Sequence, residues 1–521
     1  MSPSSSSSAL VLGVQILSLL TGVHGQDAPL FIQGALDGAT AFDDSFNSGG
    51  TISVGGFNIT VPNNLQVEFP AAYVPWKDFA RDHQSMLGYE TNVIGNFING
   101  VPMAAQILTY EFFEGLASGF IESINMTDGS MQISSGPVLR INDPNAVFSV
   151  GYTQAPFFTA DDESPSITSF SGFPMCIPRN ATDPQCPSTN RPFNGLGTFT
   201  APDPLSMAPF LPGDFVTWQG IKKGNEVIAF SIVAQNVQIT TLQDLTYVRT
   251  ELALLGISNF NGNTGLAESR IIGYVSNPRT TVALYAMDYD PCTGAVTDRI
   301  VAAVGLRGGG NPQNKFEYRA DILSGYARDY RAVAEVNGVP KTRTTKNGFL
   351  AGTYVQPVNV WVQGEQDVPG VPPPANDFSQ LPWLTQGLGL DADGNVWGPL
   401  DPFPQSGLLI EAPVCANASA APAAPAGSGD QEVWVPSSSL LNGTLPLNST
   451  SGGNLLNNTA AVLLPASLEK AKIPSSSSSS SSTTPKTSKK RDVPEGHWRT
   501  RARLDATTLP AGDPGLNQIT A

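Results

Sequence analysis

Histidine, the side chain that most often acts as a general base, is nearly absent from this sequence. The chain of 521 residues contains three, His24, His83 and His497. His24 falls in a predicted leader and His497 in a low-complexity tail, so only His83 remains for the folded part. No G-x-S-x-G motif accompanies it. The sequence therefore argues against Ser-His-Asp and Cys-His catalysis, and we interpret His83, next to Arg81 and Asp82, as a surface or supporting residue.

The four cysteines form an even set, which an exported protein would hold as disulfides. They are Cys176, Cys186, Cys292 and Cys415, and they formally allow three pairings. We expect Cys176 to pair with Cys186, and Cys292 with Cys415. Zinc and copper sites need several His or Cys ligands, and no Gly-rich phosphate loop or βαβ pattern is present. We therefore expect no metal and no cofactor.

Carboxylates are the remaining candidates for acid–base chemistry. Two Asp-rich stretches, DYDPCTGAVTD from Asp288 and DADGN from Asp391, look like fragments of calcium-binding loops. Neither completes an EF-hand, and turn-forming Asp is the preferred interpretation. Two carboxylates from these stretches, or from Asp161, Asp162 and Glu163, could hydrolyse a glycosidic bond if they lay about 5 to 9 Å apart.

Aromatic and hydrogen-bonding side chains on a weakly charged background are the other chemical resource. Most will pack in cores or on sheet faces, but several of them around a cleft would bind a flat, apolar, oxygenated small molecule. Such a site can promote a cycloaddition by aligning two partners and hydrogen-bonding a carbonyl oxygen. The predicted catalytic residues are Tyr274, Arg270 and Trp218. The predicted substrate-binding residues are Trp76, Tyr89, Tyr285, Tyr354 and Trp361.

The segments that must position these side chains are predicted to be β-strands. Short runs alternate apolar and polar residues and end at Gly, Asn-Gly, Asp-Gly or Pro. Hairpin-like units at 50–62, 119–143 and 213–239 suggest repeated small barrels. Strands that suit a sandwich are expected over 270–274, 281–287, 300–306, 330–336 and 352–362.

The overall prediction is an all-β fold of barrel-like or sandwich sheets with few short helices. One helix is expected over Trp76–Arg81, while the run 318–336 fits neither the helix period nor the strand period cleanly. The many Pro, Gly and Asp residues between 368 and 404 indicate a long extended strap.

The two ends of the chain differ in composition from its middle. Residues 1–25 have an apolar run from Ala9 to Leu20 and small residues before Gln26, as in a signal peptide. Ala, Pro, Ser, Gly and Asn dominate 415–521, which is predicted to be a disordered tail. Between them we expect an N-terminal β domain of one or two barrel-like units over 26–245. A C-terminal β-sandwich domain with the strap is expected over 246–414.

Seven N-glycosylation acceptors support export to the secretory-pathway lumen or beyond it. They are Asn58, Asn125, Asn180, Asn417, Asn442, Asn448 and Asn457. No segment after the leader has the about 20 apolar residues of a membrane span. The formal charge of −16 repels nucleic acid. The aromatic and hydrogen-bonding side chains make apolar, oxygenated small molecules the expected partners. The oligomeric state stays open.

Three motifs carry a family resemblance that extends over about residues 28–410. They are GFPMCIPR at Gly172–Arg179, GDFVTWQG at Gly213–Gly220 and DYDPCTGAVTDR at Asp288–Arg299. With them the chain resembles a family of secreted fungal proteins, and within it the intermolecular hetero-Diels-Alderases of tropolone sesquiterpenoid biosynthesis. The resemblance implies a β-rich, cofactor-independent enzyme that joins a tropolone o-quinone methide to a humulene-type alkene. It assigns no functional residue.

Two other functions fit the same composition. A non-catalytic cell-surface or carbohydrate-binding glycoprotein would use exposed Trp and Tyr side chains, and a glycosidase would use a pair of carboxylates. An enclosed pocket with convergent Tyr, Trp or Arg side chains would favour the cycloaddition enzyme. A flat aromatic strip would favour sugar binding, and two facing carboxylates in a groove would favour hydrolysis.

Overall fold

A computed structural model describes residues 27–415 except 111–115, 156, 193–196, 243–244, 258–268, 308–313, 321–324, 363–369 and 371–372. Within this part the chain is mainly β, with two short α-helices, which confirms the predicted all-β class. No helix in the described ranges is long and apolar enough to cross a bilayer. The predicted signal peptide and, beyond Cys415, the predicted tail lie outside the described residues.

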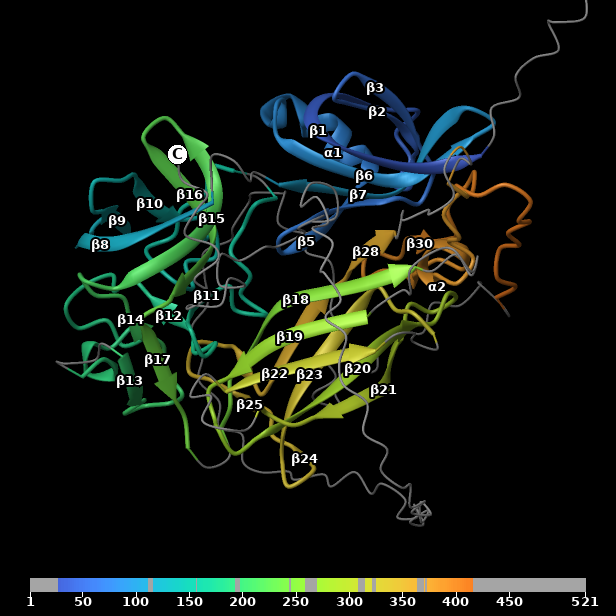
Figure 1. Cartoon of the computed structure of the whole chain (residues 1–521). Coiled ribbons are helices and arrows are strands. Elements are labelled where there is room, and N and C mark those ends of the chain that lie inside the picture. Colours follow the sequence, from blue (N-terminus) through green and yellow to red (C-terminus); the bar gives the residue numbers. More distant parts are fainter. Residues whose placement is uncertain are drawn as a thin grey trace, which may run out of the picture. The chain divides into compact units, whose positions relative to one another are not determined.

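The first sheet is a five-stranded barrel with two added strands. Its strands are β1 (Ala28–Ala41), β2 (Gly50–Val54), β3 (Phe57–Val61), β4 (Gln66–Phe69), β5 (Ala72–Pro75), β6 (Glu90–Ile98) and β7 (Val101–Tyr110). They are ordered β3-β2-β1-β6-β7-β4-β5, and a parallel pairing of β3 with β7 closes the barrel. Buried and exposed side chains largely alternate along β1, because one face of a strand meets the core. Figure 1 draws this sheet in blue.

A short helix lies between β5 and β6. Helix α1 (Trp76–Asp82) confirms the predicted helix and continues into a 3-10 turn, His83–Met86. Trp76, Phe79 and Ala80 are buried, at a spacing that places them on one helix face. The indole Nε1 of Trp76 donates to the carbonyl oxygen of Thr40 in β1 at 3.2 Å. The apolar face of α1 is therefore fixed to the barrel.

The second sheet closes in the same way as the first. Its strands are β8 (Ala117–Asn125), β9 (Ser130–Ile133), β10 (Val138–Ile141), β11 (Ile167–Ser169), β15 (Phe215–Lys223) and β16 (Glu226–Ala234). They are ordered β10-β9-β8-β15-β16-β11, and β10 also pairs in parallel with β16. Each barrel thus has a three-stranded meander, a parallel closure and a final hairpin, the order of an OB-type Greek-key barrel. Two of the predicted hairpin units, 119–143 and 213–239, contribute strands to this one barrel.

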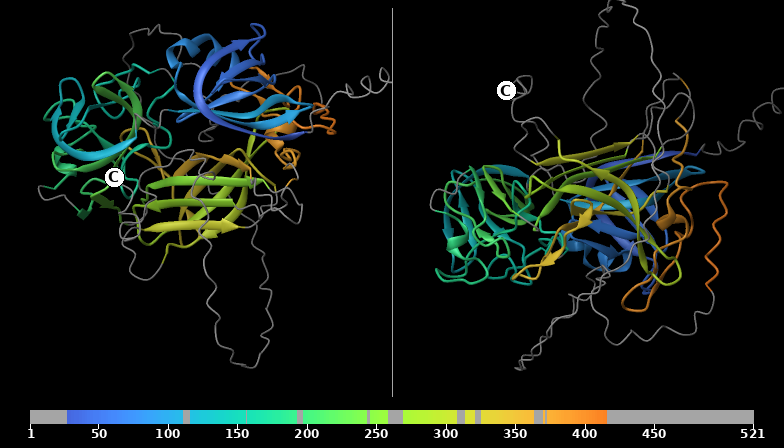
Figure 2. Two further views of the ribbon diagram at one scale, coloured as in Figure 1. Left: turned by 45° about the horizontal axis from the view of Figure 1, so that its top comes forward. Right: turned by 90° about the horizontal axis from the view of Figure 1, so that it is seen from below.

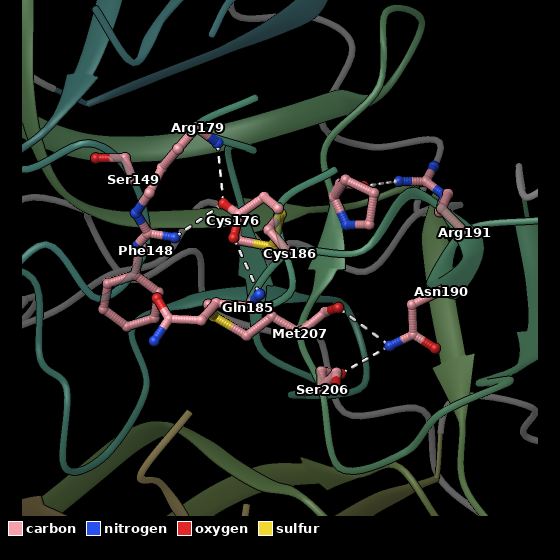
Figure 3. Close-up of a disulfide and its surroundings, with 12 residues drawn as sticks. Phe148, Ser149, Cys176, Arg179, Gln185, Cys186, Asn190, Arg191, Ser206 and Met207 are labelled. Atoms are coloured by element: carbon pink, nitrogen blue, oxygen red, sulfur yellow. Dashed lines mark hydrogen bonds and ion pairs between the residues drawn. A yellow bond between two sulfur atoms is a disulfide. The ribbon is translucent and has the colours of Figure 1, made fainter. Parts of the chain in front are cut away.

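The long connection between β10 and β15 carries a buried disulfide. It contains β12 (Met175–Cys176), β13 (Gly197–Thr200), β14 (Ala208–Pro209) and a 3-10 turn, Ser188–Asn190, while β13 pairs with β17 (Val237–Thr240). Cys176 is bonded to Cys186, as predicted. Beside this disulfide the side-chain amide of Asn190 donates to the carbonyl oxygens of Ser206 and Met207 at 2.7 and 3.0 Å (Figure 3). Covalent and polar links therefore order a segment with little regular structure.

Two further sheets follow the barrels. The third contains β18 (Val248–Ile257), β19 (Ser269–Val275), β22 (Lys315–Ala320) and β28 (Asn359–Val362), in the order β22-β19-β18-β28. The fourth contains β20 (Thr281–Tyr289), β21 (Val296–Val304), β23 (Asp329–Val336), β24 (Val339–Pro340) and β27 (Thr353–Pro357). Strands of the third sheet lie side by side in green to yellow in Figure 2. The run 318–336 is resolved as strand at both of its described ends, β22 and β23.

A buried polar cluster joins the first barrel to the fourth sheet. The hydroxyls of Tyr73 in β5 and Tyr289 in β20 donate to the two carboxylate oxygens of Asp329 at 3.1 and 2.9 Å. Nε of Arg328 also donates to Asp329 at 2.9 Å. Burial raises the pKa of the Tyr73 hydroxyl well above its usual value, so this group stays a hydrogen-bond donor.

The described part of the predicted strap, 368–404, contacts the first barrel. It includes α2 (Pro382–Thr385), β29 (Gly389–Leu390) and β30 (Val396–Trp397). A short hairpin of β25 (Arg343–Thr344) and β26 (Leu350–Ala351) precedes β27 in the chain. Asn96 of β6 donates to the carbonyl oxygens of Asn376 and Pro404 at 2.9 and 2.8 Å. The Cys292–Cys415 disulfide confirms the second predicted pairing. Both disulfides are compatible with an oxidising compartment.

Candidate functional site

A cleft is lined by the second barrel, the third and fourth sheets and nearby loops. It holds about 50 Å³ of water-accessible space within an empty volume of about 530 Å³ that includes its open mouth. The second barrel contributes Gln219, Phe230, Ser231 and Val233, and β18 contributes Arg249, Thr250 and Glu251. The other lining residues are Tyr354 and Gln356 of β27 and Pro70, Thr159, Asp161, Pro165 and Ser166 of the loops.

The cleft residues Gln219, Phe230 and Ser231 lie at a β-bulge in the second barrel. The register of β15 and β16 shifts after the Gln219–Ser231 pair, and Phe230 is left as an extra residue. The hydroxyl of Ser166 donates to the carbonyl oxygen of Phe230 at 2.6 Å, which supplies the bulge with a partner. Bulges redirect side chains and are frequent beside binding sites, and this one lies at the cleft.

A second bulge places the charged groups. The register of β18 and β19 shifts after Thr250, which leaves Glu251 as the extra residue. The Glu251 carboxylate accepts a hydrogen bond from the Arg249 guanidinium at 2.8 Å, and the two side chains are 1% and 4% exposed. Arg249 also donates to the carbonyl oxygen of Phe170 at 3.0 Å. The cation therefore has a fixed position in surroundings where its field is weakly screened.

Two aromatic rings hold the same guanidinium. The carbon of the Arg249 guanidinium lies 5.0 Å from the centre of the Tyr274 ring and 5.7 Å from that of Phe170, within the range of cation–π attraction. Gly172 lies in the turn that carries Phe170 and has a φ of +83°; a Cβ atom there would come within 2.8 Å of the Arg249 Cβ. Glycine thus lets this turn approach β18 closely. Tyr274, one of the predicted catalytic residues, supports the arginine that lines the cleft.

A chain of aromatic rings runs from the cleft into the first barrel. The Phe230 ring lies 6.0 Å from Phe158, and Phe158 lies 5.6 Å from Tyr89 in an edge-to-face contact. Phe158 also contacts Phe69 at 5.0 Å. Tyr89, predicted to bind substrate, therefore lies behind the cleft and not in its lining. Trp76 lies further along the same apolar cluster and is fully buried.

The other predicted site residues are dispersed. Trp218 is buried inside the second barrel, next in sequence to Gln219 but on the other face of β15. Arg270 forms an ion pair with Glu317 at 3.0 Å on β19 and β22. Tyr285 is half-buried in β20, and Trp361 belongs to β28. Among the predicted substrate-binding residues, Tyr354 lines the cleft.

The acidic residues near the cleft act as hydrogen-bond acceptors within the fold. Glu251 accepts from Arg249, and Asp161 Oδ1 accepts from the backbone N–H groups of Glu163 and Ser164 at 3.0 and 2.8 Å. Glycoside hydrolysis instead requires a carboxyl group that donates a proton to the leaving oxygen. The cleft therefore supplies a fixed cation and amide groups more readily than a general acid.

The two calcium-like stretches form turns, as the preferred interpretation of the sequence has it. Asp290 Oδ1 accepts from the N–H groups of Cys292 and Thr293 at 2.9 and 2.8 Å. Asp391 Oδ1 accepts from Asn395 N at 2.8 Å, and its other oxygen accepts from the indole of Trp397 at 2.8 Å. Within the described ranges, no group of three or more His, Cys, Asp or Glu side chains is placed to hold a metal ion.

The predicted glycosylation acceptors that the structure describes are all exposed. Asn58 is in β3, Asn125 ends β8, and Asn180 follows the disulfide-bonded strand β12. The acceptors Asn417, Asn442, Asn448 and Asn457 lie outside the described residues. His83 is half-buried and begins the 3-10 turn after α1, where its Nδ1 lies 2.6 Å from the carbonyl oxygen of Ala80.

Sequence reasoning missed Arg249, Glu251, Gln219 and Phe230, because strand alternation alone gives no sign of a bulge. A signal was present in two glycines inside strands, which often mark bulges. Gly220 follows Gln219, and Gly273 pairs with Thr250. A Cβ atom on Gly220 would lie 2.6 Å from the carbonyl oxygen of Ile228.

The described part of the chain defines a class: a disulfide-bonded, all-β protein of two Greek-key barrels and two further large sheets, with a cleft between them. No protein-family model matches the chain, and no curated protein matches it either.

Proposed function

We propose that this protein is an exported enzyme that joins a tropolone o-quinone methide to a humulene-type alkene by a hetero-Diels-Alder cycloaddition. The observation that carries the proposal is the buried Arg249 in the lining of a cleft that also has apolar walls from Phe230, Val233 and Pro70. The resemblance in overall character to the intermolecular hetero-Diels-Alderases adds the substrate class.

The reaction needs few chemical groups from the protein. The four π electrons of the oxygen-containing diene combine with the two of the alkene, so one C–C bond and one C–O bond form. No group leaves, no proton is transferred, and no redox change takes place. Catalysis then rests on alignment of the two partners and on stabilisation of charge at the quinone methide oxygen.

In this proposal, Arg249 donates to that oxygen. Because Glu251, Phe170 and Tyr274 already hold the guanidinium, it needs no reorganisation when charge develops on the substrate. We assign the cleft's water-accessible space of about 50 Å³ to the oxygenated end of the ligand. The alkene would lie at the open mouth against Phe230 and the proline side chains.

The compartment forms part of the proposal. The predicted signal peptide, the exposed acceptors Asn58, Asn125 and Asn180, and two disulfides support synthesis through the secretory pathway. The net charge of −16 repels polyanions, so the composition favours neutral small molecules as ligands. An extracellular or luminal site of action would also suit this composition.

The direct test is incubation of the purified protein with a quinone methide precursor and humulene. We expect a higher yield of adduct and a single dominant stereoisomer, measured by chiral chromatography against a reaction without protein. A product ratio and stereochemistry equal to those of the uncatalysed reaction would contradict the proposal.

Two matched arginine variants test the assigned donor. Arg249→Lys keeps the charge beside Glu251 but loses the planar fork, so we expect the rate to fall by at least about tenfold. Arg270→Lys alters an arginine on the neighbouring strand that has its own acidic partner, Glu317, and does not line the cleft. It should react as the wild type does. Equal losses in both variants would remove Arg249 from the mechanism.

A further inference from the structure

The two barrels share more than their strand order: they match residue by residue in register. Gly34 pairs with Thr91 in the first barrel, and Gly119 pairs with Val216 in the second. In each barrel, the strand that carries the second member of this pair has a glycine four positions further on, Gly95 or Gly220.

Both barrels also carry the same two bulges. In the first strand, Asp37 is the extra residue of β1 and Glu122 the extra residue of β8, each three positions after the paired glycine. In the last strand, Ala105 is the extra residue of β7 and Phe230 that of β16, each ten positions after Gly95 or Gly220.

The parallel pairings obey the same correspondence. Val67 of β4 pairs with Ile107, two positions after the bulged Ala105. Ile167 of β11 pairs with Ile232, two positions after the bulged Phe230. Two bulges and two strand pairings that agree in register point to two copies of one structural unit, since bulges are conserved features of related folds.

The correspondence shows which side chains differ where the cleft forms. Gln219 and Ser231 line the cleft in the second barrel, and they correspond to Ile94 and Gln106 in the first. Ile94 is buried and belongs to the apolar core. The first copy thus has an apolar side chain at the position where the second copy presents an amide to the cleft.

We infer that the barrels are copies of one unit and that Gln219 is the specificity-determining residue that selects an oxygenated ring over a hydrocarbon ring. This inference rests on the proposed function, because it assigns the polar end of the same ligand. An amide can donate to a carbonyl oxygen and accept from a hydroxyl group, so it suits a ring that carries both. A site built to pair with such groups discriminates strongly against a ligand that lacks them.

The first barrel supplies the variant that tests this role. Gln219→Ile places at the cleft the residue that the first copy has at the same register, and a β-branched side chain suits a strand. Gln238→Ile makes the same change in β17, where the side chain is half-buried and does not line the cleft. Each variant is compared with the wild type as the full secreted chain.

Binding of two simple probes separates the inference from the catalytic proposal. Tropolone carries a carbonyl and a hydroxyl group, and cycloheptatriene is a hydrocarbon ring of the same size. Using titration calorimetry, we expect Gln219→Ile to weaken tropolone binding about tenfold, the effect of losing one buried hydrogen bond. Cycloheptatriene binding should stay within about twofold, and Gln238→Ile should bind both rings as the wild type does.

The other outcomes overturn distinct statements. Unchanged tropolone binding by Gln219→Ile, with a wild type that binds tropolone, would overturn the role of Gln219 and leave the proposed function standing. An equal loss of tropolone binding in Gln238→Ile would overturn it as well. A wild type that binds neither ring would overturn the proposed ligand class and the role of Gln219 together.

Discussion

The two barrels solve one structural problem with different chemistry. Each must order the connection between its third strand and the strand that opens the final hairpin. The first barrel does so with α1, whose Trp76 and Phe79 are fully buried. The second uses residues 142–214, with a disulfide and an ion pair between Arg191 and Asp214 whose side chains are 1% and 0% exposed. Strand pairing therefore determines the barrel topology, while the connection between the strands can be stabilised by apolar or by polar contacts.

The largest expected effect comes from breaking the ion pair of the second barrel. Arg191 contacts both oxygens of Asp214, at 2.5 and 2.9 Å. Arg191→Ala would leave a buried carboxylate without its cation, so we expect a loss of about 3–5 kcal/mol in the free energy of unfolding. Urea denaturation followed by tryptophan fluorescence measures it.

The control for this variant lies in the connection of the first barrel. Arg81→Ala removes an exposed ion pair with Asp78 on α1 and should cost less than about 1 kcal/mol. Replacing both buried partners, Arg191→Met with Asp214→Leu, should cost less than Arg191→Ala alone, because no charge is left buried. A mild effect of Arg191→Ala, equal to that of Arg81→Ala, would contradict the assigned role of the pair.

An intermediate effect is expected at the glycines that the two copies share. A Cβ atom on Gly95 would overlap the carbonyl oxygen of Met103, and one on Gly220 would lie 2.6 Å from that of Ile228. Alanine at either position should lower the free energy of unfolding by about 2–3 kcal/mol, with the larger loss at Gly95. Urea denaturation of both variants ranks them.

Gly38, beside the other bulge of the first barrel, is the matched control. A Cβ atom there would meet nothing within 4 Å, so Gly38→Ala should change stability by less than about 1 kcal/mol. If alanine were tolerated at Gly95 or at Gly220 as well as it is at Gly38, the close approach at the shared bulges would not constrain the sequence.

The smallest expected effect is a pH-dependent difference between the copies. Phe215, which packs edge-to-face on Phe120, stands in the second barrel where the first has the buried Glu90. Burial raises the pKa of the Glu90 carboxyl, although a hydrogen bond from Gln33 opposes the shift. A raised pKa in an acid means that the folded state loses stability as pH rises from the ordinary value through the raised one.

Glu90→Gln should therefore stabilise the protein by about 1 kcal/mol at pH 7 and lose this advantage below the ordinary pKa of glutamate. Thermal unfolding from pH 4 to pH 8 measures the difference. Glu122→Gln, which removes an exposed carboxyl group in the second barrel, is the control. A constant difference between Glu90→Gln and the wild type across this range would contradict the assigned burial of charge.

Much of the fold could be predicted from the local sequence. Alternating apolar residues predicted the strands, the Trp76–Arg81 run predicted α1, and an even set of cysteines predicted two disulfides, whose expected pairing the structure confirms. The strands and the helix depend on a residue and its near neighbours in the chain, because strand period and turn chemistry are local properties. The ambiguous run 318–336 became strand at its described ends only because β19, β20 and β27 pair with it.

The candidate site was much harder to predict from the sequence. Of the predicted substrate-binding residues, Tyr354 lines the cleft, while Tyr89 and Trp76 belong to the aromatic cluster behind it. A tyrosine or tryptophan in a strand has the same local pattern whether it faces a core or a ligand. In the sequence, nothing separates Arg249, which we propose as the donor, from other strand arginines. The structure adds its buried ion pair with Glu251.

The sequence alone determined that this is an all-β chain with two disulfides, because strand alternation and cysteine parity are written in residue order. The tertiary structure alone decided that Gln219, Arg249 and Tyr354 line one cleft. Gln219 and Arg249 lie beside β-bulges. A bulge arises when two residues of one strand lie opposite one residue of its partner. Neither strand's own sequence specifies the register of its partner, so the site became visible only when the strands were paired.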